Sequence, residues 1–322
     1  MVNERCLCCG ELLSDGPSDQ GWHQHCIEKF FDSSTLPEID LSQKILKEYA
    51  LKSVRKGIAV PGVQKKMSLS LEKFSHRVSR LTLTDFPAGY ILKPQTEDYP
   101  SLPEAEQLVM TLADASKIST CPHALIRLKD GSLAYLTRRI DRVFSKQDVV
   151  RIPMEDCCQL SGRLTEDKYR GSYEQIASLI RRYSSQSLFD LTELYYRLLF
   201  CFVTGNSDMH LKNFSLIQVD KNLFSLSPAY DLLPVNILMP EDKEETALTL
   251  QGKNSHLTRH DFIAFAQNIG LSEKVAIDLI ASIVSLQETY GKKVEESFLP
   301  LALKQKMILL IQQRSSRLLP KA

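Results

Sequence analysis

The residues whose types and spacing could carry chemistry lie between Gly205 and Asp231. Four residues separate Asp208 from Asn213, and Asp231 follows about one short hairpin later. In metal-assisted phosphoryl transfer, a carboxylate accepts the proton of the attacking hydroxyl, while carboxylate and amide oxygens hold the Mg²⁺ that bridges the nucleotide phosphates. The spacing therefore predicts a phosphoryl-transfer site with Asp208 as base and Asn213 and Asp231 as magnesium ligands.

A buried helix and a hairpin are expected to position these side chains. The segment 190–202 is apolar nearly all round, which predicts a buried helix, and Gly205-Asn206 is typical of a helix end. Strands over 214–219 and 224–226 would then return the chain to Asp231. A single Asp or Asn after a glycine is more often a turn residue, so only the three together indicate a metal site.

An upstream segment could supply phosphate contacts. The loop Gly62-Val63-Gln64-Lys65-Lys66 could place backbone N–H groups and lysine charges against phosphates, although two glycines near a proline more often mark a hairpin. Lys93 ends a predicted strand over 90–93 and could reach the α- and β-phosphates. The predicted helix over 103–113 offers Glu106 as its partner. The ordinary alternatives are an exposed lysine and an acid that serves the helix dipole.

The order of predicted elements indicates an α+β fold. An antiparallel sheet with helices precedes a strand over 149–154, and mostly helical segments follow it, including a final helix over 294–319. We therefore expect a two-lobed, protein-kinase-like fold. The junction Glu155-Asp156-Cys157 would meet adenine through its backbone. The expected parts are a Cys/His cluster with a helix at 1–35, a smaller nucleotide-binding lobe at 36–154, and a helical lobe with the catalytic loop and metal ligands at 155–322.

Composition narrows the functional classes. The 322 residues, 43% of them hydrophobic, suffice for two lobes with ordinary cores. Because 40 Lys and Arg nearly cancel 39 Asp and Glu, no overall charge attracts the chain to nucleic acid or to an anionic membrane. No signal-peptide core and no apolar run of about 18 residues is present, so a cytoplasmic protein without membrane association is expected.

Four of the eight cysteines fall within the first 26 residues. A C-x2-C pattern followed by H-x2-C, which could close a tetrahedral zinc site, is formed by Cys6, Cys9, His23 and Cys26. Alternatively, Cys8 and Cys9 are small core residues and the segment 22–31 is simply an amphipathic helix. Both interpretations remain open at this point, and reduced thiols are expected in either case.

Eight short pieces follow one another in a recognisable order: GVQKK at 62–66, YILKP at 90–94, LPEAE at 102–106, YLTRRIDR at 135–142, EDCCQ at 155–159, KYRGSY at 168–173, GNSDMHLKNFS at 205–215, and YD at 230–231. In this order they resemble the HipA-like serine/threonine kinases, the toxins of bacterial toxin–antitoxin modules. The resemblance implies ATP and Mg²⁺ as cofactors and the same roles for the residues above. It adds His210, Lys212 and Tyr230 as nucleotide-site residues.

The resemblance also implies partners. Only some fifty residues precede the Gly-rich loop, so the chain resembles the shorter HipT-type members, in which an N-terminal subdomain is a separate small protein. That small protein and a helix-turn-helix antitoxin are implied, with DNA contacted only through the antitoxin. Relatives often autophosphorylate serines just before the Gly-Val-Gln element, where this chain has Ala59-Val60-Pro61. The nearest hydroxyls are those of Ser53, Ser68 and Ser70.

Three functions are compatible with these patterns. The first is an ATP- and Mg²⁺-dependent protein serine/threonine kinase and toxin, whose acceptor is a translation factor such as an aminoacyl-tRNA synthetase. The second is a kinase-fold subunit of a repressor complex that binds nucleotide with little turnover. The third is a small-molecule kinase, since a base and two metal ligands do not encode the acceptor.

Overall fold

The computed structural model describes residues 4–13, 20–42, 44–46, 66–74, 77–84, 88–144 and 149–320. The chain divides into two compact units, Met1–Gln107 with Cys121–Val150, and Leu108–Thr120 with Arg151–Ala322. Helix α3 (Leu102–Ala115) contributes to both. Gly62, Val63, Gln64 and Lys65 of the expected phosphate loop lie outside the described residues, as do Ser53 and Ala59-Val60-Pro61.

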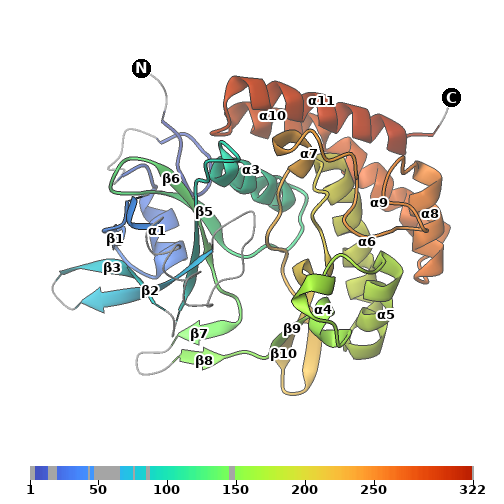
Figure 1. Ribbon diagram of the computed structural model, residues 1–322, viewed down its shortest axis with the longest axis horizontal. Helices are drawn as coiled ribbons and strands as arrows, with labels where there is room; N and C mark the ends of the chain where they lie inside the picture. Colours follow the sequence, from blue (N-terminus) through green and yellow to red (C-terminus); the bar gives the residue numbers. More distant parts are fainter. Residues whose placement is uncertain are drawn as a thin grey trace. The chain divides into compact units, whose positions relative to one another are not determined.

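The first unit is built on a six-stranded sheet in the order β1-β3-β2-β4-β6-β5 (Figure 1). All pairs are antiparallel except β1 with β3. The strands are β1 (Glu38–Ile39), β2 (Met67–Phe74), β3 (Arg77–Leu83), β4 (Tyr90–Pro94), β5 (His123–Arg127) and β6 (Leu133–Arg138). A separate pair is formed by β7 (Arg142–Phe144) and β8 (Val149–Arg151). The predicted strand that ends at Lys93 is confirmed as β4.

An aromatic cluster packs helix α1 (Gln24–Phe31) against this sheet. The ring of Trp22 lies 5.5 Å from that of Phe30 and 5.4 Å from that of Phe31, and both phenylalanines contact Tyr90 of β4. All four side chains are buried. The packing of α1 on β4 therefore depends on the burial of large aromatic side chains, which contribute strongly to the stability of a core.

The second unit combines a three-stranded sheet, in the order β11-β10-β9, with helices. Its strands are β9 (Met154–Asp156), β10 (Ser215–Asp220) and β11 (Leu223–Leu226). Its helices are α4 (Cys157–Leu160), α5 (Tyr173–Tyr183), α6 (Ser187–Thr204), α7 (Val235–Leu238), α8 (Arg259–Asn268), α9 (Glu273–Ser285), α10 (Gln287–Glu296) and α11 (Leu301–Leu318). The predicted hairpin and buried helix are confirmed as β10–β11 and α6. The chain is thus a mixed α+β protein.

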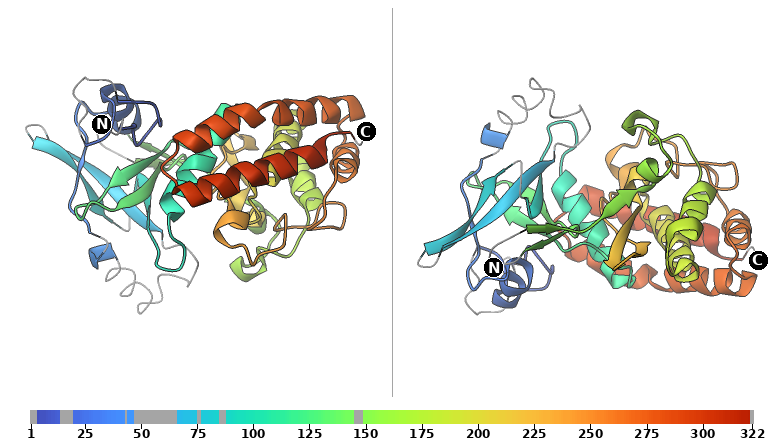
Figure 2. Two further views of the ribbon diagram at one scale, coloured as in Figure 1. Left: turned by 90° about the horizontal axis from the view of Figure 1, so that it is seen from above. Right: turned by 90° about the horizontal axis from the view of Figure 1, so that it is seen from below.

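Two predicted elements are wrong in their boundaries. The single strand expected over 149–154 is broken into β8 and β9, because Pro153 between them has no N–H to donate to a ladder. The single helix expected over 294–319 is two helices: α10 ends at Glu296, and α11 begins directly after Pro300. Figure 2 shows α10 and α11 lying side by side, with their ends joined by this short turn.

Helix α11 is fastened to the loop that precedes α8 by a buried carboxylate, Glu245. Its oxygens accept hydrogen bonds from the Arg317 guanidinium at 2.6 and 3.1 Å and from the Leu257 N–H at 2.8 Å, and Arg314 lies 3.8 Å away. Burial by itself would raise the pKa of Glu245, but these donors and charges outweigh it, so the pKa lies below its ordinary value. The folded state therefore favours the ionised form of the Glu245 carboxylate.

A Glu245→Gln variant is expected to lose about 2 kcal/mol of stability at neutral pH, because a charge-assisted hydrogen bond contributes about 1.5–3 kcal/mol. A group with a lowered pKa in the folded state stabilises above its unfolded pKa of about 4.3, and that stabilisation is lost as the pH falls through the folded value. The difference in the free energy of unfolding between wild type and variant, measured by urea unfolding, should therefore shrink from pH 7 to pH 3. An exposed neighbour, Glu241→Gln, is the control; a difference that is constant with pH would contradict the assignment.

Among the described residues, no helix is both long and apolar enough to cross a membrane.

Candidate functional site

The loop that carries Asp208 begins where buried helix α6 ends. Gly205 has a φ of +71°, a left-handed conformation that ends the helix, and an added Cβ there would collide with the side chain of Leu310. The Asn206 N–H then donates to the Cys201 carbonyl at 2.8 Å. The start of the loop is consequently fixed by a helix most of whose residues are buried.

Asp208 and Asn213 are held in one hydrogen-bonded turn. The Asp208 carbonyl accepts from the His210 N–H at 2.8 Å and from the Asn213 amide nitrogen at 3.0 Å, and the Asn213 N–H donates to the His210 carbonyl at 2.9 Å. Asn213 is buried in the short 3₁₀ turn Leu211–Asn213. Because its nitrogen is used inside the turn, the amide oxygen is the atom left to bind a cation.

Tyr169 lies against the expected base. Its hydroxyl donates to Asp208 Oδ1 at 2.7 Å, and its ring stands edge-on to His210, with centroids 5.1 Å apart. Burial and this hydrogen bond raise the pKa of Tyr169 above its ordinary value. The negative charges of Asp208, Asp231 and Asp242 add to the rise in this pKa. Asp231 itself has a φ of +61°.

Tyr230 connects the segment of Asp231 to the catalytic loop. Its hydroxyl donates to the Lys212 carbonyl at 3.0 Å and lies 2.6 Å from the Ser215 hydroxyl at the start of β10. The segment before Asp231 is therefore tied to the turn that holds Asn213. The predicted contact of Tyr230 with nucleotide remains a prediction.

The predicted hinge and the catalytic loop meet directly. Lys212 donates to Asp156 Oδ2 at 2.7 Å, while the other oxygen of Asp156 caps α4 by accepting from the Gln159 N–H at 2.9 Å. The Asp156 N–H donates to the Gln159 side chain at 3.0 Å, and the Cys157 N–H donates to the Phe214 carbonyl at 2.8 Å. Adenine recognition through either N–H would have to replace one of these bonds.

The two neighbours of Asp156 differ in exposure. Cys157 is buried, and burial followed by the nearby Asp156 charge raises the pKa of its thiol to about 12, so it stays protonated at neutral pH. Glu155 is exposed on β9. Its side chain is accordingly available to a ligand, and that of Cys157 is not.

In the first unit, Lys93 forms an ion pair with Glu106 of α3, as predicted. Both side chains are almost fully buried, at 3% and 0% exposure. The ammonium also lies 5.3 Å from the centre of the Tyr135 ring. The ordinary alternatives, an exposed lysine and an acid that serves only the helix dipole, are therefore wrong. Of the expected phosphate loop, only Lys66 is described, and it is exposed.

Sequence reasoning missed three residues around the catalytic loop. Tyr169 stood inside a matching motif without a role, and Asp242 lay in a run of charges typical of a solvated surface. The structure has Asp242 accept a hydrogen bond from the Ser207 hydroxyl at 2.7 Å, next to Asp208. Asn236 supports the same loop: its N–H donates to the Gly205 carbonyl at 3.1 Å. Contacts of this range leave no local pattern in a sequence.

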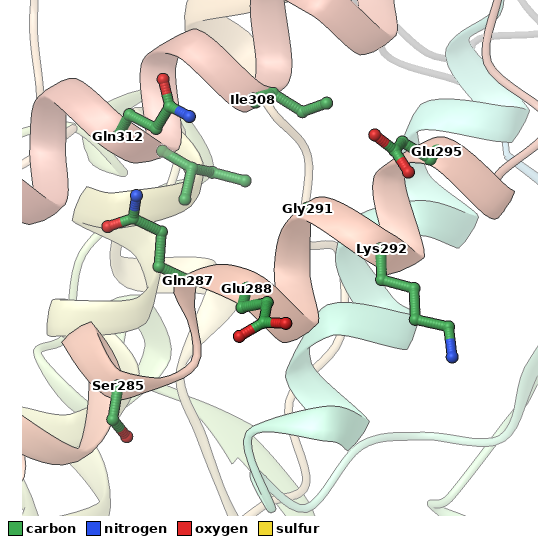
Figure 3. A pocket seen from close by; sticks show the side chains of 9 residues that line it. Ser285, Gln287, Glu288, Gly291, Lys292, Glu295, Ile308 and Gln312 are labelled. Atoms are coloured by element: carbon green, nitrogen blue, oxygen red, sulfur yellow. The ribbon is translucent and has the colours of Figure 1, made fainter.

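A hollow of about 640 Å³ lies elsewhere in the second unit, between α10 and α11 (Figure 3). Its lining mixes charged and apolar side chains, among them Glu288, Lys292, Glu295 and Ile308. None of the expected site residues lines it, so it is not a candidate for the phosphoryl-transfer site.

A Tyr169→Phe variant tests whether this hydroxyl competes with the acceptor for Asp208. If Asp208 is the base that the sequence predicts, the Tyr169 hydroxyl occupies an oxygen that the base needs, and its removal is expected to raise kcat/KM for phosphate transfer about two- to tenfold, corresponding to the roughly 0.5–1.5 kcal/mol of an ordinary hydrogen bond. Steady-state kinetics with ATP and a protein acceptor would measure this. Tyr183→Phe, on an exposed tyrosine of α5, is the control; a tenfold fall in the Tyr169 variant would instead make the hydroxyl a positioning group.

Comparison with known proteins places these features in context. Residues 58–289 match the family profile described as HipA-like C-terminal domain. A Haemophilus influenzae protein whose name assigns it provisionally to the kinases is 29% identical over 323 residues, 90% of this chain and 88% of its own length. Two similarly named Sinorhizobium fredii proteins, Y4dM and Y4mE, are 31% and 30% identical over 67% and 65% of this chain. The chain spans only 54% and 51% of their lengths.

Two solved structures share the fold. The HipA toxin of Shewanella oneidensis, determined in a complex with HipB and operator DNA, superposes with a TM-score of 0.68 at 19% identity, covering 84% of this chain and 70% of HipA. The Helicobacter pylori proinflammatory kinase CtkA gives a TM-score of 0.52 at 10% identity, covering 78% of this chain and 93% of CtkA. The α+β fold of this chain is thus of the kind found in these kinase-like proteins.

Proposed function

Since the chain belongs to the HipA-like C-terminal domain family, we propose that it is a serine/threonine protein kinase that uses ATP and Mg²⁺. The names of its relatives and the fold of its structural neighbours support a kinase-like function. The observation that carries the proposal is the loop after α6, where one hydrogen-bonded turn joins the Asp208 backbone carbonyl to the Asn213 amide and so holds these two residues together.

In this proposal the second unit supplies the reacting groups. Asp208 accepts the proton of the acceptor hydroxyl, and Asn213 and Asp231 hold Mg²⁺, for which hard carboxylate and amide oxygens are suitable ligands. When bound, the ion neutralises charge on the phosphates. Asp231 stands in a left-handed conformation, a feature that persists mainly where the surroundings enforce it.

The remaining expected residues bind nucleotide. Lys93 contacts phosphate from the lobe proposed for residues 36–154, and its pairing with Glu106 fixes the ammonium in place. In the lobe proposed for residues 155–322, Lys212 and Asp156, which are hydrogen-bonded to each other, also contact the nucleotide. The other proposed contacts are Gly62, Val63, Gln64, Lys65, Lys66, Glu155, Cys157, His210 and Tyr230.

The acceptor and the partners are proposed by analogy with the family. We assign the chain to the toxins of toxin–antitoxin modules, acting in the cytoplasm on a translation factor such as an aminoacyl-tRNA synthetase. The Shewanella HipA structure, which shares the fold, was solved with HipB and operator DNA. By analogy, a helix-turn-helix antitoxin and a separate small N-terminal subdomain protein are the proposed partners of this chain.

A nucleotide-binding subunit with little turnover is the alternative. It is favoured by one observation, the hydrogen bond that the Tyr169 hydroxyl donates to Asp208, because that bond occupies the base. A kinase, by contrast, would have to release this bond when the acceptor hydroxyl arrives.

Phosphate transfer from γ-labelled ATP separates the two. The full chain is incubated with ATP and a bacterial lysate, with Mg²⁺ or with excess chelator, and labelled proteins are identified by mass spectrometry. A kinase is expected to label one dominant serine or threonine only with Mg²⁺. Calorimetric binding of ATP without any labelled protein or ADP would overturn the kinase proposal in favour of the regulatory subunit. Labelled metabolites without labelled protein would indicate a small-molecule kinase.

A further inference from the structure

The four residues of the N-terminal Cys/His pattern converge in the first unit. One ligand atom from each lies within 4.8 Å of all the others, in the group Cys6, Cys9, His23 and Cys26. Ligands about 2.0–2.3 Å from a tetrahedral zinc are themselves separated by roughly 3.3–3.8 Å, so the four side chains need only small adjustments. We propose that they bind one Zn²⁺, which holds the N-terminal segment on the sheet.

The backbone around the first two cysteines is already shaped for a metal. The Gly10 N–H donates to the Cys6 carbonyl at 2.9 Å, which closes a tight turn over the C-x2-C segment, and Gly10 has a φ of +77°. The backbone N–H of His23 points at the Cys6 sulfur at 3.4 Å. N–H groups directed at sulfur stabilise a thiolate, the form in which cysteine binds zinc.

The His23 ring is oriented by contacts at both of its nitrogens. Its Nε2 lies 3.1 Å from the Leu12 carbonyl oxygen, and its Nδ1 lies 3.4 Å from the Cys9 sulfur. A carbonyl can only accept a hydrogen bond, so Nε2 carries the proton and Nδ1 keeps its lone pair toward the cysteines. A metal-binding histidine characteristically donates its other N–H to a carbonyl or a carboxylate in this way.

The site is closed and therefore structural. Four protein ligands complete a tetrahedron, whereas catalytic zinc sites keep a position open for water. Cys6 and Cys26 are buried, and Cys26 lies on α1. The loop between the first two ligands is bonded to the rest of the unit: Leu7 accepts from the Leu125 N–H of β5 at 2.8 Å, and Cys8 accepts from the Gln107 side chain at 3.0 Å. Gln107 directly follows Glu106, the partner of Lys93.

Two neighbours of the cluster offer matched controls. Cys8 lies between the first two ligands but is not one of the four, and its contact to Gln107 uses only its backbone carbonyl. The exposed His25 stacks on His23 with ring centroids 5.1 Å apart, and its Nε2 lies 3.4 Å from the Cys26 sulfur. Substitution of either changes the local chemistry without removing a proposed ligand.

Metal analysis of the full chain tests the proposal. Protein purified without chelator or metal-affinity resin is expected to hold one zinc per chain by mass spectrometry, while Cys9→Ser and Cys26→Ser hold less than a tenth of that. Cys8→Ser and His25→Gln should retain full occupancy. A thiol-modifying reagent should release the zinc of the wild type, as read by a metallochromic dye, and chelation should lower Tm by several degrees.

Cobalt substitution gives a readout that does not depend on variants that fold poorly. The wild type refilled with Co²⁺ should show the visible absorption of tetrahedral cobalt with thiolate ligands. Wild-type protein with less than a tenth of an equivalent of zinc, or with octahedral cobalt spectra, would overturn the proposal. So would a disulfide among the three cysteines in protein kept under reducing conditions, or loss of zinc in Cys8→Ser and His25→Gln equal to that in Cys9→Ser.

Discussion

Replacing Asp208 by Asn is expected to lower kcat for phosphate transfer by about 10²–10⁴-fold, the range in which a positioned general base contributes. Asn keeps the shape of the side chain and can still accept the Tyr169 hydroxyl bond, but it cannot take a proton. The turn around it depends on the Asp208 backbone carbonyl, which the substitution leaves in place. Fold and affinity for ATP should therefore remain close to those of the wild type.

Single-turnover transfer from γ-labelled ATP measures the chemical step, and calorimetry measures ATP binding separately. The control is Asp220→Asn, an exposed acid at the end of β10, which should transfer phosphate at the wild-type rate. An Asp208→Asn protein that unfolds at the wild-type temperature and still transfers phosphate within tenfold of the wild-type rate would remove Asp208 from the role of base.

Elements with a strong local pattern were predictable from the sequence. The apolar run that becomes α6, the glycine that ends it and the alternating strands of the following hairpin each follow from side-chain period or backbone freedom. The capping box at Thr258 before α8 and the Ser272 cap of α9 are local signals of the same kind. The loop that carries Asp208 could therefore be located without any knowledge of tertiary contacts.

The surroundings of that loop could not be predicted, because they depend on contacts between distant segments. The hydroxyl of Tyr169 reaches Asp208 across 39 positions, and Lys212 reaches Asp156 across 56. Neither pair leaves a period or a spacing that a local pattern could detect. The break before α11 is different in kind: Pro300 was visible in the sequence, but the apolar residues on both sides of it continued the helical period and hid the boundary.

Removing only one member of the Lys93–Glu106 pair is expected to destabilise the fold strongly. Both groups are buried, and an uncompensated charge left in such a site costs about 3–5 kcal/mol. Glu106→Leu should thus lower the free energy of unfolding by about this amount. The double variant Lys93→Met with Glu106→Leu replaces both charges by apolar side chains of similar volume, which is often nearly neutral, so it should recover most of the loss.

Stability and catalysis separate in this double variant. If Lys93 binds nucleotide phosphates as proposed, the double variant folds like the wild type in urea unfolding but has a raised KM for ATP and transfers phosphate at least about 10²-fold more slowly, the scale of a lost charge at a phosphoryl-transfer site. An exposed ion pair serves as control: Lys129→Met, opposite Asp40 at 2.6 Å, should leave both the free energy of unfolding and phosphate transfer close to those of the wild type. A double variant that recovers both stability and phosphate transfer would show that the buried lysine serves the fold alone.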